Sequence, residues 1–314
     1  MCANPNPNEL RESAPMKLPA VAASGIVVGL VLALGAPMPA NSTTPIVKKL
    51  LWSEEFAGKA GSSINKAVWN FDIGDGTESG IPGWGNSERQ YYVEGAIKQD
   101  GKGSAVITAT RMKVDPSGQP TKANPYLCYY GTNCEWTSAK VTTFGKLSFQ
   151  YGRMEARIKM PKGVGMWPAF WMLGADIKTN AWPKCGEIDI IEAKGVNPKT
   201  AYGTSHGPGY SGGEGIGGLT AMKTFNYSGF NNYAIEWMPD QIKWLLNDKV
   251  YFTLNKKDVG TKEWVFNKEF YLIMNVAVGG QFTGDVDPDL KSGAMSIDWV
   301  RYYSINGQGK VTKY

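Results

Sequence analysis

The chain has 314 residues, of which 38 are glycine, 18 are proline and only 19% are charged. So many helix-interrupting residues exclude a long helical bundle, and a net charge of +5 from basic residues scattered among acids argues against a nucleic-acid partner. A single histidine, His206, supplies too few ligands for a histidine-rich metal site and limits a catalytic triad to one position. The remaining catalytic repertoire is mainly that of carboxylates.

The N-terminal segment has the pattern of a secretory signal peptide. Residues 18–34 carry no charge, follow a lysine, and lead into small residues where Ala36 or Ala40 would be the last residue removed. We therefore predict a leader at residues 1–40 and secretion to the extracellular space or the periplasm. The alternative is an uncleaved membrane anchor, since the apolar run approaches the roughly 20 residues that span a bilayer. We favour cleavage, and so expect no membrane contact in the mature protein.

Residues 41–314 show no charge block, repeat or low-complexity linker, and we expect them to form a single domain. Runs of β-branched and aromatic residues alternate with turn residues about every ten positions, which predicts an all-β sandwich or barrel with little helix. The clearest strand segments are 105–111, 146–160, 233–237, 241–246 and 270–278. In the second of these, polar and apolar residues alternate from Arg153 to Lys159, the pattern of a strand with one face in solvent.

Two cysteines of the mature chain are candidates for a disulfide. Cys128 and Cys134 lie in a loop rich in glycine, asparagine and proline, and export would place them in an oxidising compartment. Two free thiols are the alternative, because the sequence does not reveal the separation of the side chains. Cys2 would leave with the leader, and we expect Cys185 to be a small buried side chain rather than a nucleophile.

The most informative segment is EIDIIE at residues 187–192, which places three acids among isoleucines. Like charges on a core strand cost free energy that folding does not repay, so we expect these acids to serve chemistry. In a regular strand Glu187 and Asp189 share one face and Glu192 points to the other. A one-residue bulge at Ile190–Ile191 would return Glu192 to the face of the other two acids.

With that bulge, the spacing of the two glutamates suits glycoside hydrolysis. Their Cα atoms would lie about 13 Å apart at ~3.3 Å per strand step. Side chains that lean together would bring the carboxyl groups to roughly 5–6 Å, near the ~5–5.5 Å of retaining glycosidases and short of the ~6.5–9.5 Å of inverting ones. We therefore predict a double displacement in which one glutamate attacks the anomeric carbon and the other serves as acid and base. Asp189 would hydrogen-bond a neighbour and keep the protonation states apart.

Two other interpretations of the three acids remain open. Carboxylates are preferred calcium ligands, but these lie on a strand without the loop oxygens of a calcium site. A strand with its acids in water is the second alternative, although the flanking isoleucines predict a buried opposite face. We favour catalytic acids because burying like charges lowers the stability of the fold, and a catalytic role explains why the chain has them there.

The motif and its surroundings resemble glycoside hydrolase family 16. The pattern E-[IL]-D-hydrophobic-hydrophobic-E is read directly in EIDIIE, and its extra hydrophobic residue is similar to the bulged branch that holds the laminarinases. Further similar segments occur in family order: WSEEF (52–56), GWGNSERQYY (83–92), GMWPAFWMLG (165–174), YGTSHGPGYSGG (202–213), FYLIMNVAVGG (270–280) and IDWVRYY (297–303). The resemblance implies a β-jelly roll, a sandwich of two antiparallel sheets with a concave substrate cleft. It also implies that Glu187 is the nucleophile, Glu192 the acid/base and Asp189 an assisting residue.

Four tryptophans are candidates for sugar binding, because the apolar faces of pyranose rings stack on aromatic rings. Trp167, Trp171 and Trp182 precede Glu187 closely, and the resemblance places these positions in the minus-side subsites. Trp84 stands in a glycine-rich loop that would form a rim. We expect the following tryptophans to fill the core instead: Trp52, Trp69, Trp136, Trp244, Trp264 and Trp299.

The resemblance also points to five polar cleft residues: Asn86, Lys140, His206, Asn275 and Gln281. Asn275 interrupts an apolar strand and needs a partner, which is either sugar or a core group. Lys140 would contact sugar or be a solvated strand residue. We expect His206 to bind sugar rather than act as a general base, since two competent carboxyl groups are present.

A structural calcium ion on the convex side is a further implication of the resemblance. Glu54 and Asp298 would be its acidic ligands, and backbone oxygens would supply the rest. The ion would be non-catalytic, and we expect catalysis to require no cofactor. We also expect a monomer whose partner is a polysaccharide.

Together these patterns predict that residues 41–314 are a glycoside hydrolase catalytic domain, a secreted, retaining endo-β-1,3-glucanase acting on laminarin-like glucan. The same machinery acting on mixed-linkage β-glucan, or on an agarose- or carrageenan-type galactan, is one alternative, and transglycosylation is another. A sulfated substrate would need clustered basic residues in the cleft, which the sequence does not show. A non-catalytic β-glucan-binding lectin is the alternative of another class, but all three acids are present.

Overall fold

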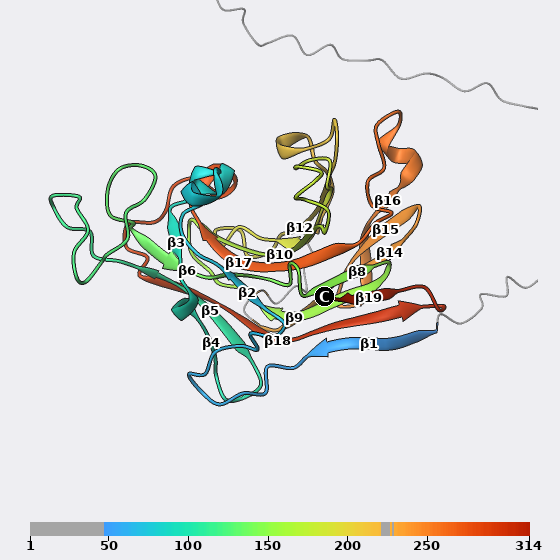
Figure 1. The fold of residues 1–314 in the computed structure, drawn as a ribbon, viewed down its shortest axis with the longest axis horizontal. Coiled ribbons are helices and arrows are strands. Elements are labelled where there is room, and N and C mark those ends of the chain that lie inside the picture. Colours follow the sequence, from blue (N-terminus) through green and yellow to red (C-terminus); the bar gives the residue numbers. More distant parts are fainter. Residues whose placement is uncertain (1–46, 221–226, 228) are drawn as a thin grey trace, which may run out of the picture. The chain divides into compact units, whose positions relative to one another are not determined.

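Strands dominate the structure, a computed structural model that describes residues 47–220, 227 and 229–314. These strands form two sheets stacked face to face (Figure 1). Helix in the described ranges is limited to α1 (Gly280–Thr283) and short 3-10 turns, and none of it is long and apolar enough to cross a membrane. The prediction of an all-β sandwich is confirmed. The predicted leader, residues 1–40, lies outside the described residues.

The first sheet has ten strands. Its strands are, in spatial order, β16 (Lys249–Asn255), β15 (Gln241–Leu246), β14 (Asn231–Met238), β9 (Gly152–Lys159), β18 (Ser292–Ile305), β5 (Ala105–Arg111), β6 (Trp136–Ser138) and β3 (Gln90–Tyr92), with β1 (Lys48–Glu54) beside β18 and β4 (Ile97–Gln99) beside β5. Strands β3 and β6 run parallel, whereas β18 pairs antiparallel with each of its neighbours.

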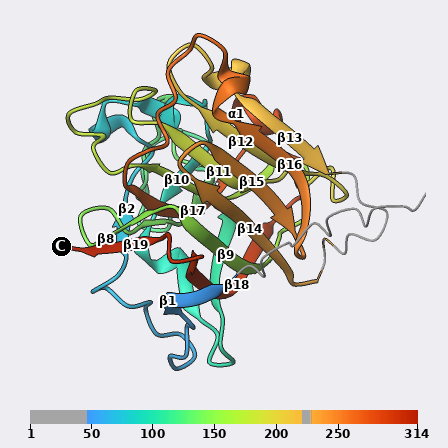
Figure 2. The same ribbon diagram turned by 90° about the vertical axis from the view of Figure 1, so that its right-hand side faces the viewer.

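The second sheet has nine strands and carries the three acids on β11. Its strands are, in spatial order, β13 (Ile216–Thr220), β12 (Ala201–His206), β11 (Glu187–Glu192), β10 (Met166–Gly174), β17 (Phe270–Val278), β7 (Lys140–Thr142) and β2 (Asn70–Asp72), with β8 (Leu147–Gln150) beside β17 and β19 (Lys310–Lys313) beside β8. Strand β10 therefore lies between β11 and β17, as Figure 2 shows.

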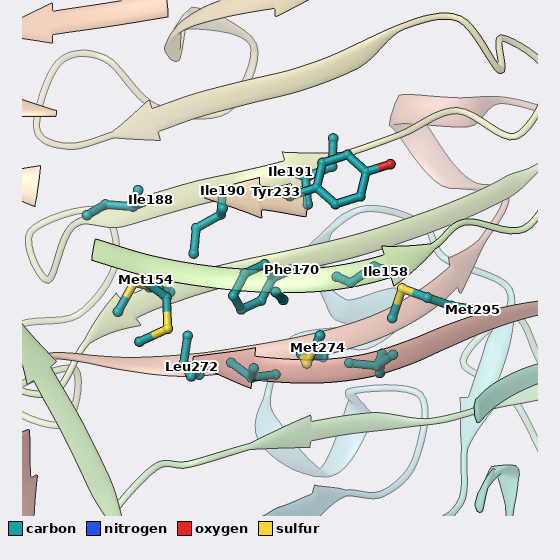
Figure 3. Packing of buried hydrophobic residues seen from close by; sticks show 14 of the residues in the cluster. Met154, Ile158, Phe170, Ile188, Ile190, Ile191, Tyr233, Leu272, Met274 and Met295 are labelled. Carbon is teal, nitrogen blue, oxygen red and sulfur yellow. The ribbon is translucent and has the colours of Figure 1, made fainter. Parts of the chain in front are cut away.

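The hydrophobic core lies between the two sheets. Met154 and Ile158 of β9 meet Phe170 of β10 and the isoleucines of β11 there (Figure 3). Strand β17 is buried over its whole length. Burying each large apolar side chain contributes roughly 1.5–3 kcal/mol, so this layer anchors the sheet that carries the three acids.

The segment 146–160 forms two strands, not the single one predicted. Tyr151 and Gly152 both have positive φ values, 60° and 77°, and the chain passes there from β8 in one sheet to β9 in the other. A Cβ atom on Gly152 would lie 2.3 Å from the carbonyl oxygen of Tyr303. Only glycine fits at position 152.

The start of β9 is more buried than the alternating pattern predicted. Arg153 is 2% exposed and Glu155 is 7% exposed. The Arg153 guanidinium makes ion pairs with Glu155 at 3.0 Å, Glu236 at 3.2 Å and Asp248 at 2.6 Å. The prediction of a solvent-facing polar side is wrong at this end, because three carboxylates compensate the buried cation.

The predicted disulfide and the predicted burial of Cys185 are confirmed, while Cys2 lies outside the described residues. Cys128 and Cys134 form a disulfide with Cα atoms 5.0 Å apart, and Cys185 is free and buried. The disulfide-bonded loop packs against η2 (Pro82–Gly85), the turn that carries Trp84. The backbone N–H of Tyr129 donates a hydrogen bond to the side-chain carboxylate of Asp75. The backbone carbonyl of Asp75 accepts a hydrogen bond from the backbone N–H of Trp84.

Most tryptophans predicted for the core lie there. Trp69, Trp136 and Trp244 are at most 1% exposed, and two more, Trp52 and Trp264, pack partly buried against the core. The prediction is wrong for Trp299, which is partly exposed. The Arg301 guanidinium lies 4.2 Å from its ring centroid, and this cation–π contact takes the place of core packing.

Candidate active site

The bulge predicted at Ile190–Ile191 is present in β11. Asp189 pairs with Trp171 of β10, and Ile191 pairs with the β10 residue just before it, so Ile190 has no partner on β10. The same extra residue separates Asp189 from Glu192 against β12. The isoleucines of the strand are buried in the core, at most 1% exposed. The three acids therefore share the opposite face of the sheet.

Strand register aligns cleft residues across the centre of this sheet. Lys140 of β7 pairs with Asn275 of β17, Asn275 with Ala169 of β10, and Ala169 with Glu192 of β11. Paired residues direct their side chains to the same face, so these side chains form one row. A depression on that face is lined by Asn86, Glu88, Trp167, Ala169, Trp171, Glu187, Asp189, Glu192 and Asn275.

Asp189 lies between Glu187 and His206. The carboxyl groups of Glu187 and Asp189 are hydrogen-bonded to each other, so one of them carries the proton. His206 pairs with Glu187 across β11 and β12, and its Nε2 atom lies 3.1 Å from Oδ2 of Asp189. Trp182 donates its indole N–H to Oε2 of Glu187 over 2.6 Å.

Burial raises the pKa of all three acids. For Glu187 the second cause is the negative charge of Asp189, and for Asp189 it is that of Glu192. The pKa of Glu192 rises to about 7 through burial, opposed by the hydrogen bond from Trp167. Three carboxyl groups so placed do not all ionise at neutral pH, so the site retains a proton for acid catalysis.

The environments of the acids suggest where the protons lie. Asp189 is 2% exposed, whereas both glutamates are partly exposed. Burial and an ionised Asp189 together raise the pKa of Glu187 to about 8, so Glu187 is readily an anion only when the shared proton lies on Asp189, the deepest of the three groups, which then donates to it. With Trp182 as a second donor, Glu187 is stabilised as an anion. Glu192 accepts one bond, from Trp167 Nε1 at 2.8 Å, and keeps its proton.

The structure brings the predicted tryptophans together around the acids, with different exposure. Trp182 is 45% exposed, so a ring face is open for stacking. Trp167 is 9% exposed and mainly holds Glu192. Trp171 is partly exposed and donates its N–H to Oδ1 of Asn275 over 2.8 Å.

Asn275 and Lys140 are both engaged by neighbouring side chains. Asn275 is 6% exposed, and its Nδ2 donates to the Tyr92 hydroxyl over 3.1 Å, which favours the satisfied-amide alternative over direct sugar binding. The Lys140 ammonium lies 3.9 Å from the ring centroid of Trp84 and 3.3 Å from Oδ2 of Asp72. Its side chain is 11% exposed, so the solvated-strand alternative is wrong.

The remaining predicted residues lie at the rim. The Trp84 indole donates to the carbonyl of Gly74 over 3.3 Å and leaves the ring partly exposed. Asn86 is partly exposed and donates to Oε1 of Glu88 over 3.1 Å. Gln281 has an exposed side chain that does not line the depression, and its backbone N–H donates to the carbonyl of Asn86.

Several cleft residues were missed from the sequence. Phe282 lies with its ring centroid 5.0 Å from that of Trp167 and 5.3 Å from that of Tyr202, and the Lys194 ammonium lies 4.2 Å from it. Their positions in the sequence could have indicated a place in the cleft. Phe282 directly follows Gln281, and Tyr202 lies an even number of residues before His206, so both side chains point to the same face of the strand. Glu88, 6% exposed, was also missed.

The two side chains predicted for calcium each have another partner in the structure. Asp298 forms an ion pair with Arg157, and Oε1 of Glu54 accepts the backbone N–H of Phe56 over 3.2 Å. Within the described ranges, the one group of three metal-binding side chains is Glu187, Asp189 and His206, inside the cleft. A cation at Asp298 would compete with the Arg157 guanidinium already paired there.

Comparisons with known proteins agree with this geometry. The profile of "Glycosyl hydrolases family 16" matches residues 84–301. A β-glucanase of Rhodothermus marinus is 36% identical over 267 residues, which cover 81% of this chain and 85% of that protein. Among solved structures, the laminarinase catalytic domain of Thermotoga maritima has a TM-score of 0.73 and 41% identity, with 82% of this chain and 98% of that one covered. The endo-β-1,3-glucanase of Pyrococcus furiosus has a TM-score of 0.73 and 39% identity, with 82% and 95% covered.

Proposed function

The chain belongs to glycosyl hydrolases family 16, and on that basis we propose that it is an endo-β-1,3-glucanase that cleaves laminarin-like glucan by a retaining double displacement. The observation that carries the mechanism is the bulge at Ile190, which puts Glu187, Asp189 and Glu192 on one face of β11. A double displacement requires two carboxyl groups of different protonation on one face, and the bulge brings Glu192 to the face of Glu187.

In the first step Glu187 attacks the anomeric carbon. A bond forms between its carboxylate oxygen and that carbon while the glycosidic carbon–oxygen bond breaks. Glu192 donates its proton to the departing oxygen. Asp189 stabilises the attacking anion by its hydrogen bond to Glu187, and the Trp182 N–H fixes the orientation of that carboxylate.

In the second step Glu192, now ionised, removes a proton from water. The resulting hydroxide oxygen bonds to the anomeric carbon, and the ester bond to Glu187 breaks. Two inversions at the same carbon give net retention. His206 contributes through Asp189, because its Nε2 contacts Oδ2 of that residue and no reacting atom needs a third acid.

The cleft surface suits a glucan chain. The exposed face of Trp182 and the rim residue Trp84 offer apolar platforms for pyranose faces, and Asn86 presents a partly exposed amide for hydroxyl groups. Lys140, whose ammonium lies 5.4 Å from the ring centroid of Trp171, is already paired with Asp72. This neutralised cation favours a neutral glucan over a sulfated galactan.

We also propose that the protein is secreted and acts as a monomer. An exported chain would form the Cys128–Cys134 disulfide in an oxidising compartment. Detection of a mature N-terminus near residue 41 in the culture medium would test secretion, and retention of the full chain in the membrane fraction would contradict it. Light scattering of the purified protein would test the monomer.

The function is tested by product analysis on laminarin, lichenan and agarose. We expect oligosaccharides from laminarin at the highest rate. Preferred cleavage of lichenan or agarose would identify a different polysaccharide, and binding without product would identify a lectin. Glu187→Gln should abolish release of reducing ends from laminarin while binding stays measurable; unchanged hydrolysis would contradict the assignment.

A further inference from the structure

Glu88 is a buried carboxylate that the double displacement does not use. It is 6% exposed and lines the same depression as the three catalytic acids. Its oxygens accept three hydrogen bonds: from Asn86 Nδ2 at 3.1 Å, from Gln90 Nε2 at 2.6 Å and from the Tyr92 hydroxyl at 3.2 Å. Three donors converge on it, Asn86 from just after η2 and the other two from β3. Burial raises the pKa of Glu88, and these hydrogen bonds and the charge of Lys140 oppose that rise and stabilise the anion.

The hydrogen bonds that meet at Glu88 have a fixed direction. Trp171 Nε1 donates to Oδ1 of Asn275, and Nδ2 of Asn275 donates to the Tyr92 hydroxyl. The Tyr92 hydroxyl then donates its own hydrogen bond to Oε2 of Glu88. An acceptor oxygen at position 88 completes this chain, and an ionised carboxylate supplies acceptors to all three donors at once, so Glu88 and the orientation of Trp171 are linked.

A second chain joins Glu88 to the centre of the sheet and to the rim. Gln90 donates to Glu88 through Nε2, and its Oε1 accepts the backbone N–H of Val278 on β17 over 2.8 Å. Asn86 donates a hydrogen bond from Nδ2 to Glu88, so its Oδ1 atom remains available to accept a hydrogen bond in the cleft. Glu88 therefore orients an amide at the rim as well as an aromatic ring on the floor.

The charge of Glu88 acts on the acid/base residue. The charged and titratable groups around Glu88 are Lys140 of β7, Tyr92 of β3 and Glu192 of β11. Glu192 faces three further groups on its own and the adjacent strand, which are Glu187, Asp189 and His206. The negative charges of Glu88 and Glu187 both raise the pKa of Glu192, after the larger effect of burial.

We propose that Glu88 is an anionic positioning residue that orients Asn86 and, through Tyr92 and Asn275, Trp171, from a place in the same depression as Glu192. The inference rests on the proposed glucanase function. Glu88 touches neither the scissile bond nor the attacking water. It acts through the residues that do.

The test compares pH profiles of kcat/KM on laminarin for variants that separate charge from hydrogen bonding. Glu88→Gln and Glu88→Ala remove the charge, and in the alanine variant water can reach the three donors. Tyr92→Phe breaks the link to Asn275 and keeps the charge. Glu135→Gln is the matched control, because it removes an acid 3.6 Å from Arg89, outside the depression.

Both Glu88 variants should raise KM several-fold and move the basic limb of the profile to lower pH by about 0.5 pH unit, less than a charge in direct contact would cause. Tyr92→Phe should raise KM and leave that limb in place, and Glu135→Gln should match the wild type. A folded Glu88 variant with an unmoved basic limb, or an equal shift in Tyr92→Phe, would overturn the proposal. A wild type that does not cleave laminarin would instead contradict the glucanase function.

Discussion

Trp182 donates its indole N–H to Oε2 of Glu187 over 2.6 Å, so the most exposed tryptophan of the cleft is tied to the nucleophile. The same side chain thus offers a stacking face and orients the attacking group. Sugar binding next to Glu187 and activation of Glu187 are coupled through one residue.

Trp182→Phe should separate these two roles. The variant keeps an aromatic face but removes a hydrogen bond to a charged group, which contributes about 1.5–3 kcal/mol. We expect kcat/KM on laminarin to fall roughly 10- to 100-fold with little change in KM. Losing a donor also destabilises the Glu187 anion, so the acid limb of the pH profile should move to higher pH. Trp182→Ala should raise KM in addition, and equal kinetics for the two variants would contradict the double role.

The rate should depend on pH through Glu192, whose pKa burial raises to about 7. Glu192 must be protonated to assist departure of the leaving group, so kcat/KM should fall as pH rises through about 7. The acid limb should follow ionisation of Glu187, which requires the proton on Asp189, because burial and an ionised Asp189 together raise the pKa of Glu187 to about 8. The Glu192→Gln variant can be measured on a substrate whose leaving group needs no proton. Its pH profile should lack the basic limb. A basic limb that persists in this variant would show that another group is responsible for it.

The contribution of Glu192 to the free energy of unfolding should decrease as pH rises, whereas an ion-paired surface acid contributes less as pH falls. The raised pKa of Glu192 means that the folded protein binds its proton more tightly than the unfolded chain does. This contribution is complete below the ordinary glutamate pKa of 4.5 and is lost as pH rises to about 7. Glu192→Gln should therefore raise Tm at pH 8 by about 2–4 °C for each kcal/mol of this contribution and leave Tm nearly unchanged at pH 4. Equal Tm differences at both pH values would contradict the burial of this carboxyl group.

The Cys128–Cys134 disulfide should affect substrate affinity as well as stability. The Tyr129 ring lies so close to Gly83 that a Cβ atom there would come within 2.9 Å of it, and Gly83 precedes Trp84 in the rim. A Cys128→Ser, Cys134→Ser double variant should lower stability by about 2 kcal/mol and raise KM for laminarin. Its kcat should stay close to that of the wild type. A KM equal to that of the wild type would argue against a specific link between the disulfide-bonded loop and Trp84.

His206 should act as a positioning residue. Its Nε2 atom lies 3.1 Å from Oδ2 of Asp189, and that carboxyl group hydrogen-bonds Glu187. His206→Ala should lower kcat about ten-fold but leave measurable activity, because Glu192 remains the acid and base. His206→Asn, which retains a polar contact, should recover part of the loss. Activity below that of Glu192→Gln would show that His206 transfers the catalytic proton itself.

Much of the site follows from local sequence. The bulge in β11 was predictable because strand parity separates Glu192 from Glu187, and a single extra residue is the simplest way to reunite them. The strand segments 105–111, 241–246 and 270–278 coincide with β5, β15 and β17. Alternation and turn residues act over a few positions, so the sequence reveals them directly.

Other features depend on pairings between distant segments. The bond between Asn275 and Tyr92 joins residues 183 positions apart, and no local pattern predicts that β17 meets β3 through side chains. Glu88 is read as an ordinary surface acid until that pairing is known. The break at Tyr151 was missed for a different reason, because tyrosine rarely adopts positive φ and so gives no turn signal.

The most direct test of the account is the stereochemistry of the first product. Proton NMR of laminarin during the initial minutes of hydrolysis distinguishes the two anomers of the new reducing end before they equilibrate. The double displacement by Glu187 and Glu192 predicts that the β-anomer forms first and the α-anomer grows in later. Initial release of the α-anomer would show a single displacement and contradict the roles assigned to the two glutamates.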